Sequence, residues 1–405
     1  MKEGWTYKKL GEVCDTINGL WKGKKPPYVN VGVIRNANFT KEFTIRYDNI
    51  EYLDVEEKQY SKRKLQKGDL IIEKSGGGEK QPVGRAVLFE KKDGEYSFSN
   101  FTSVLRIKNN EELLSKFLYT YLLFIYKRGD TLSMQRATTG IHNIEFDKYL
   151  SIDIPCLPLS EQQRIVSRLD SAFAHIDELK ANAEKQLSEA RTLFQKALTK
   201  AMEPKEGWEE KTLGKIAKVF SGYAFKSGIF QKEGKYQVIR IGNIKQNSLK
   251  LSDNAIFIDD IDSGLLQKSL LKEGDLVVTQ TGTRHKRDYG FVAMVDKNNL
   301  LLNQRNACIR FDNKLSAQFF LYYSYTELYK DSFFANEGGT VGQGNVGLSA
   351  LKEMIYYAPP LSEQQRIVSR LDSLSAHVHE LEEVTQKTIA ECDALKQALL
   401  RKVFE

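Results

Sequence analysis

The chain has 405 residues, a net charge of +7 and an ordinary globular composition, with 41% apolar and 28% charged residues. No run of about 18 uncharged apolar residues occurs, so we expect no membrane span, and the first residues lack the apolar core of a signal peptide. The four cysteines have no CxxC spacing and the five histidines form no HExxH, which argues against a metal site and favours a reduced, cytoplasmic location.

Residues 1–157 form a first block whose short apolar runs predict strands. The runs are "DLIIE" (69–73), "AVLFE" (86–90) and "SVLRI" (103–107), bounded by Gly, Asp, Asn and Lys turns. The aromatic stretch at 113–128 has helical length and periodicity. We expect its rings to lie in the core rather than to serve as base-stacking platforms.

Residues 158–203 predict one long helix. "PLS" offers a proline and then Ser160 as N-cap, with Gln163 three residues later. Apolar residues, Leu179 among them, then recur at steps of three and four as far as Ala201, which is the seam of a coiled coil. At 1.5 Å per residue the helix is on the order of 60 Å long.

Residues 204–359 form a second block, and residues 360–405 a second helix. The block has strand runs at 275–279, 291–295 and 307–311 and a predicted aromatic helix at 316–331. The apolar seam of the second helix runs from Ile367 through Val384 and Leu395 to Val403. Because each helix has one apolar stripe, we expect the two helices to pair with each other, in antiparallel orientation.

The chain is an internal duplication. "PLSEQQRIVSRLDS" at 158–171 returns letter for letter at 360–373, and "GIHNI" from Gly140 aligns with "GQGNV" from Gly342 at the same spacing of 202. The blocks hold the excess positive charge, with 26 basic against 21 acidic residues in the first and 21 against 17 in the second. This excess is either a solvated surface or the footprint of a polyanion such as nucleic acid.

Three motif look-alikes give no support for catalysis. "GQGNVG" at 342–347 fits GxGxxG but follows a helical stretch rather than a strand, and "KPPY" at 25–28 has a lysine where an amino-methyltransferase needs a hydrogen-bond acceptor. "GDLIIEK" at 68–74 has the counterpart "GDLVVTQ", so Asp69 and Asp275 are better interpreted as turn residues ahead of a strand. We therefore expect no catalytic residue, no metal and no bound cofactor in this chain.

Two variable blocks, each followed by "LSEQQRIVSRLD" and a long helix, resemble the specificity subunit of type I restriction–modification systems, as do the "GDLII/GDLVV" strands and "SGYAFKS" at 221–227. The resemblance covers the whole chain and implies an α+β fold. Two pseudo-repeated α/β target-recognition domains (1–157 and 204–359) are then separated by two long antiparallel coiled-coil helices (158–203 and 360–405).

The resemblance also implies function and partners. Each domain reads one half of a bipartite, asymmetric site on double-stranded DNA. The helices set the spacer and dock two modification subunits, which methylate adenine N6 with S-adenosylmethionine, and restriction subunits that use ATP and Mg join them. The docking residues implied on the helices are Gln162, Arg164, Arg168, Gln364, Arg366 and Arg370. The alternative is a coiled-coil scaffold that presents two protein-binding modules without contacting DNA.

Bases are read by polar and basic side chains that loops deliver into the major groove. The loop after each GDL strand is the predicted reader, because its glycines allow close backbone approach and its cations suit phosphates or guanine edges. A flexible, solvated hairpin is the alternative for each loop. The predicted DNA-binding residues are Lys74, Ser75, Lys80, Gln81 and Arg85 in the first loop, Gln280, Thr281, Thr283, Arg284, Lys286 and Arg287 in the second, and Arg35, Arg240 and Lys245 elsewhere, with Arg305 and the "TTGIHN" segment at 138–143 as lesser candidates.

Overall fold

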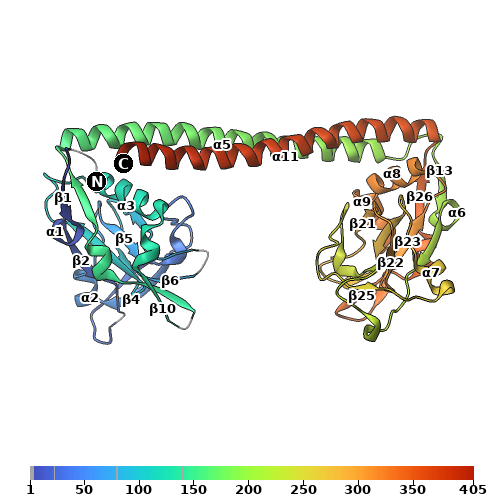
Figure 1. Cartoon of the computed structure of the whole chain (residues 1–405), viewed down its shortest axis with the longest axis horizontal. Coiled ribbons are helices and arrows are strands. Elements are labelled where there is room, and N and C mark those ends of the chain that lie inside the picture. Colours follow the sequence, from blue (N-terminus) through green and yellow to red (C-terminus); the bar gives the residue numbers. More distant parts are fainter. Residues whose placement is uncertain (1–3, 22, 79–80, 139) are drawn as a thin grey trace. The chain divides into compact units, whose positions relative to one another are not determined.

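The computed structural model describes residues 4–21, 23–78, 81–138 and 140–405. The chain separates into two compact units, Met1–Glu184 with Thr385–Glu405, and Lys185–Val384. Two long helices, α5 (Leu159–Met202) and α11 (Leu361–Phe404), each contribute to both units (Figure 1). Each unit therefore combines one block with part of both helices. The four predicted segments describe the order of blocks and helices along the sequence, whereas the two units describe how the chain packs.

The first block is built from small sheets. Their strand orders are β2-β9-β5-β7, β4-β3-β8 and β10-β11-β6, and β1 pairs with β12. The predicted strand runs correspond to β5, β7 and β9, and the predicted aromatic helix is α3. The strands are β1 (Thr6–Lys9), β2 (Cys14–Asn18), β3 (Tyr28–Ile34), β4 (Glu51–Glu56), β5 (Leu70–Glu73), β6 (Ser75–Gly77), β7 (Ala86–Leu88), β8 (Tyr96–Phe98), β9 (Thr102–Ile107), β10 (Gln135–Thr138), β11 (Ile141–Ile144) and β12 (Asp153–Cys156), and the helices are α1 (Leu10–Val13), α2 (Glu57–Ser61), α3 (Ser115–Arg128) and α4 (Phe146–Leu150), with 3-10 turns at Asn36–Asn38 and Asp130–Met134.

The second block repeats this topology. Its orders are β14-β23-β19-β21, β18-β15-β22 and β24-β25-β20, with β13 paired to β26 and an added hairpin of β16 and β17. The duplication seen in the sequence thus extends to the strand order. The strands are β13 (Glu209–Thr212), β14 (Lys218–Ser221), β15 (Tyr236–Ile239), β16 (Ile244–Lys245), β17 (Ser248–Leu249), β18 (Phe257–Ile258), β19 (Leu276–Thr279), β20 (Thr281–Thr283), β21 (Val292–Met294), β22 (Leu300–Leu302), β23 (Asn306–Arg310), β24 (Gly338–Gly339), β25 (Gln343–Asn345) and β26 (Ile355–Ala358), and the helices are α6 (Leu213–Ile216), α7 (Ser263–Ser269), α8 (Lys314–Tyr323), α9 (Glu327–Phe334) and α10 (Leu348–Glu353), with 3-10 turns at Ser227–Ile229 and Ile241–Asn243.

The prediction of a single helix at 316–331 is wrong, because α8 ends at Tyr323 and α9 begins at Glu327. The hydroxyls of Ser324 and Thr326 donate to carbonyls three residues earlier, and Thr326 Oγ1 also accepts from the backbone N–H of Tyr329. Side chains that hydrogen-bond the nearby backbone stop one helix and cap the next.

The turns before the two GDL strands are stabilised by equivalent hydrogen bonds in the two blocks. Asp69 Oδ2 accepts from the backbone N–H of Gln66 at 2.7 Å, and the carboxylate takes two hydrogen bonds from Arg106. Asp275 makes the equivalent bonds to Lys272 and Arg310. The interpretation of both aspartates as turn residues is confirmed.

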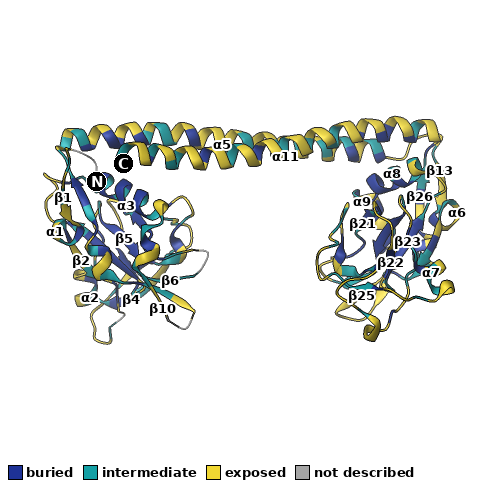
Figure 2. Cartoon of the chain, in the orientation of Figure 1, coloured by how far each residue is buried: buried dark blue, intermediate teal, exposed yellow. Residues whose placement is uncertain are grey.

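Each block joins the long helices through a hydrophobic core (Figure 2). In unit 1, Phe404 at the end of α11 packs edge-on against Phe117 and Tyr121 of α3, with ring centroids 5.9 and 5.1 Å apart. In unit 2, α8 packs on Ile367 of α11 and on Met202 of α5. The aromatic helices therefore lie in the core, as predicted.

Within each unit α5 and α11 pair in antiparallel orientation, which confirms the predicted pairing. In unit 1, Lys396 Nζ lies 2.5 Å from Asp177, and Thr385 Oγ1 lies 3.5 Å from the carbonyl of Ala183. In unit 2, Arg191 lies 2.6 Å from Glu382. A residue further along α5 thus meets a residue earlier in α11.

Details of the predicted seam are wrong. Leu179, Val384 and Leu395 are exposed, and Thr385 is buried where Val384 was expected. The helices begin at Leu159 and Leu361, two residues before the start that a serine N-cap would give, so that Ser160 lies inside the first turn.

Candidate nucleic-acid interface

The segment that follows β5 is hydrogen-bonded to the turn before β9. The backbone N–H groups of Lys74 and Ser75 both donate to the carbonyl of Phe101, at 3.0 and 3.2 Å. Ser75 then pairs with Asn143 in the ladder between β6 and β11. The structure therefore brings together the predicted reader loop and the lesser candidate segment at 138–143, which are far apart in the sequence.

The second block makes the same junction. The N–H of Gln280 donates to the carbonyl of Arg305 at 3.1 Å, and Thr281 pairs with Asn345 in the ladder between β20 and β25. The position of Phe101 in the first block is thus taken by Arg305 in the second.

A glycine-containing loop completes each junction. Leu20 forms a bridge with Ser99, and Tyr223 forms the equivalent bridge with Asn303. A Cβ at Gly19 would lie 1.9 Å from the carbonyl oxygen of Ser99, so only glycine permits this approach. We call the resulting surfaces loop face 1 (residues 18–21, 74–78, 99–101 and 141–144) and loop face 2 (residues 221–224, 280–284, 303–305 and 343–345).

Loop face 1 carries two exposed aromatic rings, Trp21 with 66% and Phe101 with 54% of its surface accessible, and loop face 2 carries Tyr223 with 41%. Sequence analysis missed Trp21 and Phe101, because each stands in a short segment that reads as the edge of a strand. The available signal for Trp21 was a large aromatic residue two positions after the Asn18-Gly19 pair.

Buried polar atoms without a partner gather at these junctions. Among the described residues, Arg35 Nε, Asn36 Oδ1, Ser99 Oγ and His142 Nδ1 lack a hydrogen-bond partner in or beside loop face 1, and Thr281 Oγ1 and Asn306 Oδ1 lack one at loop face 2. Asn36 belongs to this group because its amide donates to the carbonyl of Ser75. Unsatisfied buried polar groups are rare in folded proteins, so that each of these atoms calls for a partner or another explanation.

Several predicted contacts are already engaged within the fold. In the second block, Arg284 lies 3.7 Å from Glu337, Arg287 stacks 4.6 Å above the ring of Phe334, and Arg240 donates to the carbonyl of Asn254. In the first block, Arg35 pairs with Glu51 and Lys74 donates to Asn18 at 3.3 Å. Burial lowers the pKa of Lys74.

Other predicted contacts face solvent. Lys245, Lys286 and Arg305 are exposed, and none of them makes an ion pair with the described part of the chain. The loop at 283–288 is a braced turn rather than an open hairpin, because Thr283 accepts from the N–H of Arg287 and donates its own N–H to Asp288 at 2.6 Å. That bond to Thr283 lowers the pKa of Asp288. Gln81 is exposed, whereas Lys80 lies outside the described residues.

Two predicted DNA contacts are corrected. Arg85 is buried and donates from Nε and Nη2 to the carboxylate of Glu73, at 2.6 and 3.1 Å, across strand ends. Gln280 is also buried, and its side chain donates to the carbonyl of Val346 at 3.0 Å. Both side chains are therefore engaged inside the fold, where they bond Glu73 and Val346.

Two predicted docking residues are corrected as well. Gln162 is buried, accepts from the N–H of Leu114 and donates to the carbonyls of Glu112 and Leu157. Gln364 is buried in the same place of unit 2 and bonds Pro359 and Ser316. These glutamines fasten the start of each helix to its block.

The remaining predicted docking residues lie at repeat-equivalent places on the two helices. Arg164 and Arg366 each pair with a glutamate three residues earlier, at 2.7 Å, and remain largely exposed. Arg168 and Arg370 are exposed one turn further along. Gln163 and Gln365 are exposed beside them and donate to Ser167 and Ser369.

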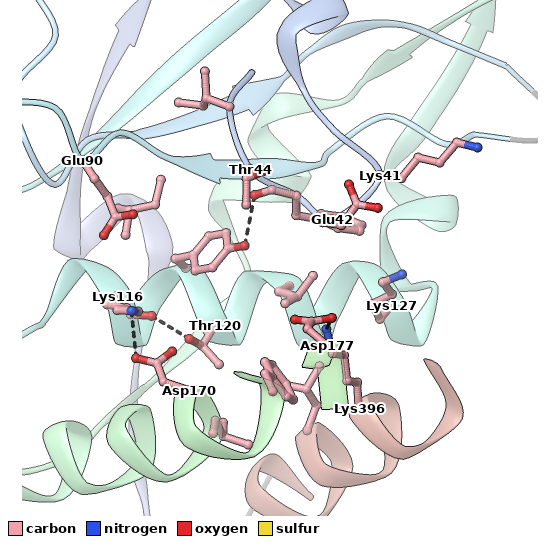
Figure 3. Close-up of a pocket in the computed structure, with 18 of the residues that line it drawn as sticks. Lys41, Glu42, Thr44, Glu90, Lys116, Thr120, Lys127, Asp170, Asp177 and Lys396 are labelled. Atoms are coloured by element: carbon pink, nitrogen blue, oxygen red, sulfur yellow. Dashed lines mark hydrogen bonds and ion pairs between the residues drawn. The ribbon is translucent and has the colours of Figure 1, made fainter. Parts of the chain in front are cut away.

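A cavity of about 740 Å³ opens in unit 1 between α3, the loop at 41–47 and the helix pair (Figure 3). Lys116 pairs with Asp170 at its wall, and Lys396 pairs with Asp177. The two copies of the repeat are offset by 202 residues. Lys396 of α11 therefore corresponds to Phe194 of α5, and the small Thr120 of α3 corresponds to Tyr322 of α8. In unit 2 the rings of Tyr322 and Phe194 contact each other, 6.4 Å between centroids, and occupy the equivalent place.

No group of three or more His, Cys, Asp or Glu side chains within the described residues is arranged to hold a metal ion. In the same part of the chain, no helix has both the length and the apolar character needed to cross a membrane.

Comparison with known proteins agrees with this architecture. The chain is 24% identical over 437 residues to the EcoKI specificity subunit of Escherichia coli K12 and 24% identical over 438 residues to the StySPI specificity subunit of Salmonella potsdam, and in each case all of this chain covers 89% of the relative. The HsdS subunit from Thermoanaerobacter tengcongensis has a similar fold, with a TM-score of 0.60 at 20% identity over 100% of this chain and 97% of that one.

A second solved chain, from a study of complex assembly and conformational transition in a type I R-M system, has a TM-score of 0.76 at 20% identity and covers 100% of this chain and 98% of its own. The family model for the type I restriction modification DNA specificity domain matches residues 2–189 and again residues 205–391. With two matched repeats on two blocks of equal topology, the chain belongs to the family of type I restriction–modification specificity subunits.

Proposed function

We propose that each block reads one half of a bipartite, asymmetric DNA target. The observation that carries this proposal is the contrast between topology and surface: the blocks share their strand order, yet equivalent positions of the loop faces hold Phe101 and Arg305. Two readers with one scaffold and different side chains suit two unlike half-sites. The excess positive charge of both blocks supports a polyanionic ligand.

The helices are proposed to set the spacer between the half-sites and to dock two modification subunits. Identical partners need like surfaces, and the exposed arginines at 164 and 168 recur at 366 and 370 on the same repeated sequence. The pairing of α5 with α11 within each unit supports a role of the paired helices as a docking surface of that unit.

Catalysis is assigned to the partners. Modification subunits are proposed to methylate adenine N6 with S-adenosylmethionine, and restriction subunits to translocate and cleave DNA with ATP and Mg. The residues of this chain then supply recognition and positioning only.

The test is binding of the assembled complex, this chain with its modification subunits, to a library of DNA duplexes at several salt concentrations. We expect selection of one bipartite sequence and an affinity that falls steeply with salt, because phosphate contacts release counterions. Binding without sequence preference or salt slope would contradict the proposal and favour the protein scaffold.

A further inference from the structure

The position shared by Phe101 and Arg305 is fixed by the backbone in the same way in both blocks. Each residue immediately precedes the strand residue, Thr102 or Asn306, that pairs with the end of the GDL strand. Each carbonyl accepts the N–H of the first residue after that strand. The two side chains therefore leave the fold from equivalent points on a hydrogen-bonded support, which is how precise recognition residues are held.

Both side chains are exposed. Phe101 is more than half exposed, and Arg305 is exposed and has no carboxylate within ion-pair distance among the described residues. A single exposed apolar ring is ordinary, but Phe101 shares its loop face with Trp21. Both positions also adjoin buried polar atoms without partners, at Ser99 and Asn306.

The two residues have opposite chemistry. An arginine donates two parallel hydrogen bonds to O6 and N7 of guanine, whereas a phenyl ring contacts the methyl group of thymine or enters a flexible base step. Equivalent points that carry such different groups give the blocks different base preferences without any change of scaffold.

We infer that this shared position determines specificity in both half-sites: Arg305 reads a guanine in the half-site of the second block, and Phe101 makes an apolar contact with a base in that of the first. The inference rests on the proposed DNA recognition and adds the residues that carry it.

The experiment compares the methylated motif and the duplex affinity of the complex formed with wild-type chain, Phe101→Ala, Arg305→Ala and Arg305→Lys. We expect Arg305→Ala to reduce discrimination at one base pair of one half-site by about 5- to 150-fold and to leave the other half-site unchanged. Arg305→Lys is expected to relax the same base pair, because lysine keeps the charge but loses the paired geometry. Phe101→Ala is expected to relax only the other half-site.

The matched controls are Lys92→Ala and Lys297→Ala. Both lysines are exposed in the turns that precede β8 and β22, away from the loop faces. With either control variant we expect both half-sites of the methylated motif to stay as in wild type. If Arg305→Ala instead weakens binding equally on all sequences and lowers the salt slope by about one, Arg305 contacts phosphate and the inference fails. A wild-type complex without sequence preference would overturn the proposed function itself, which is a separate outcome.

Discussion

The strand after the GDL turn, β5 or β19, ends on Glu73 in the first block and on Thr279 in the second. Its antiparallel partner, β7 or β21, begins directly after Arg85 in the first block and directly after Phe291 in the second. The first block thus buries an ion pair where the second has a buried hydroxyl and a partly buried ring, with Thr279 Oγ1 accepting from the N–H of Phe291 at 3.1 Å. The contacts between block and helices differ too. A cavity lies beside Thr120 in unit 1, whereas the rings of Tyr322 and Phe194 fill the equivalent space in unit 2. One topology therefore tolerates very different interior contacts.

The largest effect is expected from breaking the buried ion pair. Arg85→Met leaves the carboxylate of Glu73 buried and unpaired, which should lower the free energy of unfolding by about 3–5 kcal/mol, as measured by urea denaturation. The double variant Glu73→Thr, Arg85→Phe copies the second block and is expected to recover most of that loss. A double variant as unstable as Arg85→Met would show that the two blocks are not interchangeable here.

The helix junctions give an opposed pair of substitutions. Tyr322→Thr removes a ring that packs on Phe194 and a hydrogen bond of 2.6 Å to Asp372, and we expect it to destabilise the protein by about 2–4 kcal/mol. Thr120→Tyr places the ring into the existing cavity of unit 1 and should change the stability by less than about 1 kcal/mol. Equal losses from both substitutions, measured by thermal or urea unfolding, would contradict the asymmetry.

The buried glutamines test what the units share. Gln162→Leu removes the partner of three backbone groups, and Gln364→Leu removes the partner of the Pro359 carbonyl and of the Ser316 hydroxyl. Each substitution should cost about 1–3 kcal/mol. Gln162 is expected to cost more, because it holds three backbone groups. The exposed neighbours provide controls, since Gln163→Leu and Gln365→Leu should stay within about 0.5 kcal/mol of wild type. A control as damaging as the buried substitution would refute the anchoring role.

The helix surface gives the smallest effect. Lys180 of α5 pairs with Asp393 of α11 in unit 1, and at the repeat-equivalent positions of unit 2 Arg191 of α5 pairs with Glu382 of α11. At these two equivalent positions the base lies on α5 and the acid on α11, so that pairing of either helix with its own copy would oppose like charges there, whereas the pair of Lys396 on α11 with Asp177 on α5 has the opposite polarity. Lys180→Glu should cost below about 1 kcal/mol, more at low salt, and adding Asp393→Lys should restore the pair. No salt dependence in the single variant would argue against this role.

The pair of Arg191 and Glu382 predicts an effect of pH on stability. The hydrogen bond from Arg191 lowers the pKa of Glu382. A lowered folded pKa stabilises the protein above the unfolded value, about 4.3, and this contribution is lost as pH falls through the folded pKa. The difference in free energy of unfolding between wild type and Arg191→Gln should therefore stay constant at higher pH and shrink only as the pH falls through that acid range. A difference that stays constant from pH 7 to pH 2 would contradict it.

Patterned features of the fold were predictable and contacts between distant residues were not. The verbatim repeat and the heptad spacing predicted both long helices to within a residue or two at each end. Arg85 was taken for a DNA contact because nothing local reveals that Glu73 lies across the strand end. Gln162 looked like any polar residue on a helix surface, and its burial follows from docking of α3, about 50 residues earlier. Phe101 was missed because its exposure depends on a turn that only the folded sheet defines.

The most direct test of the central claim is the methylated motif of cells that carry the chain with residues 204–359 exchanged for the corresponding block of another family member. The account predicts that one half of the motif changes to that member's sequence while the other half stays as in wild type. A motif that changes in both halves, or in neither, would contradict it.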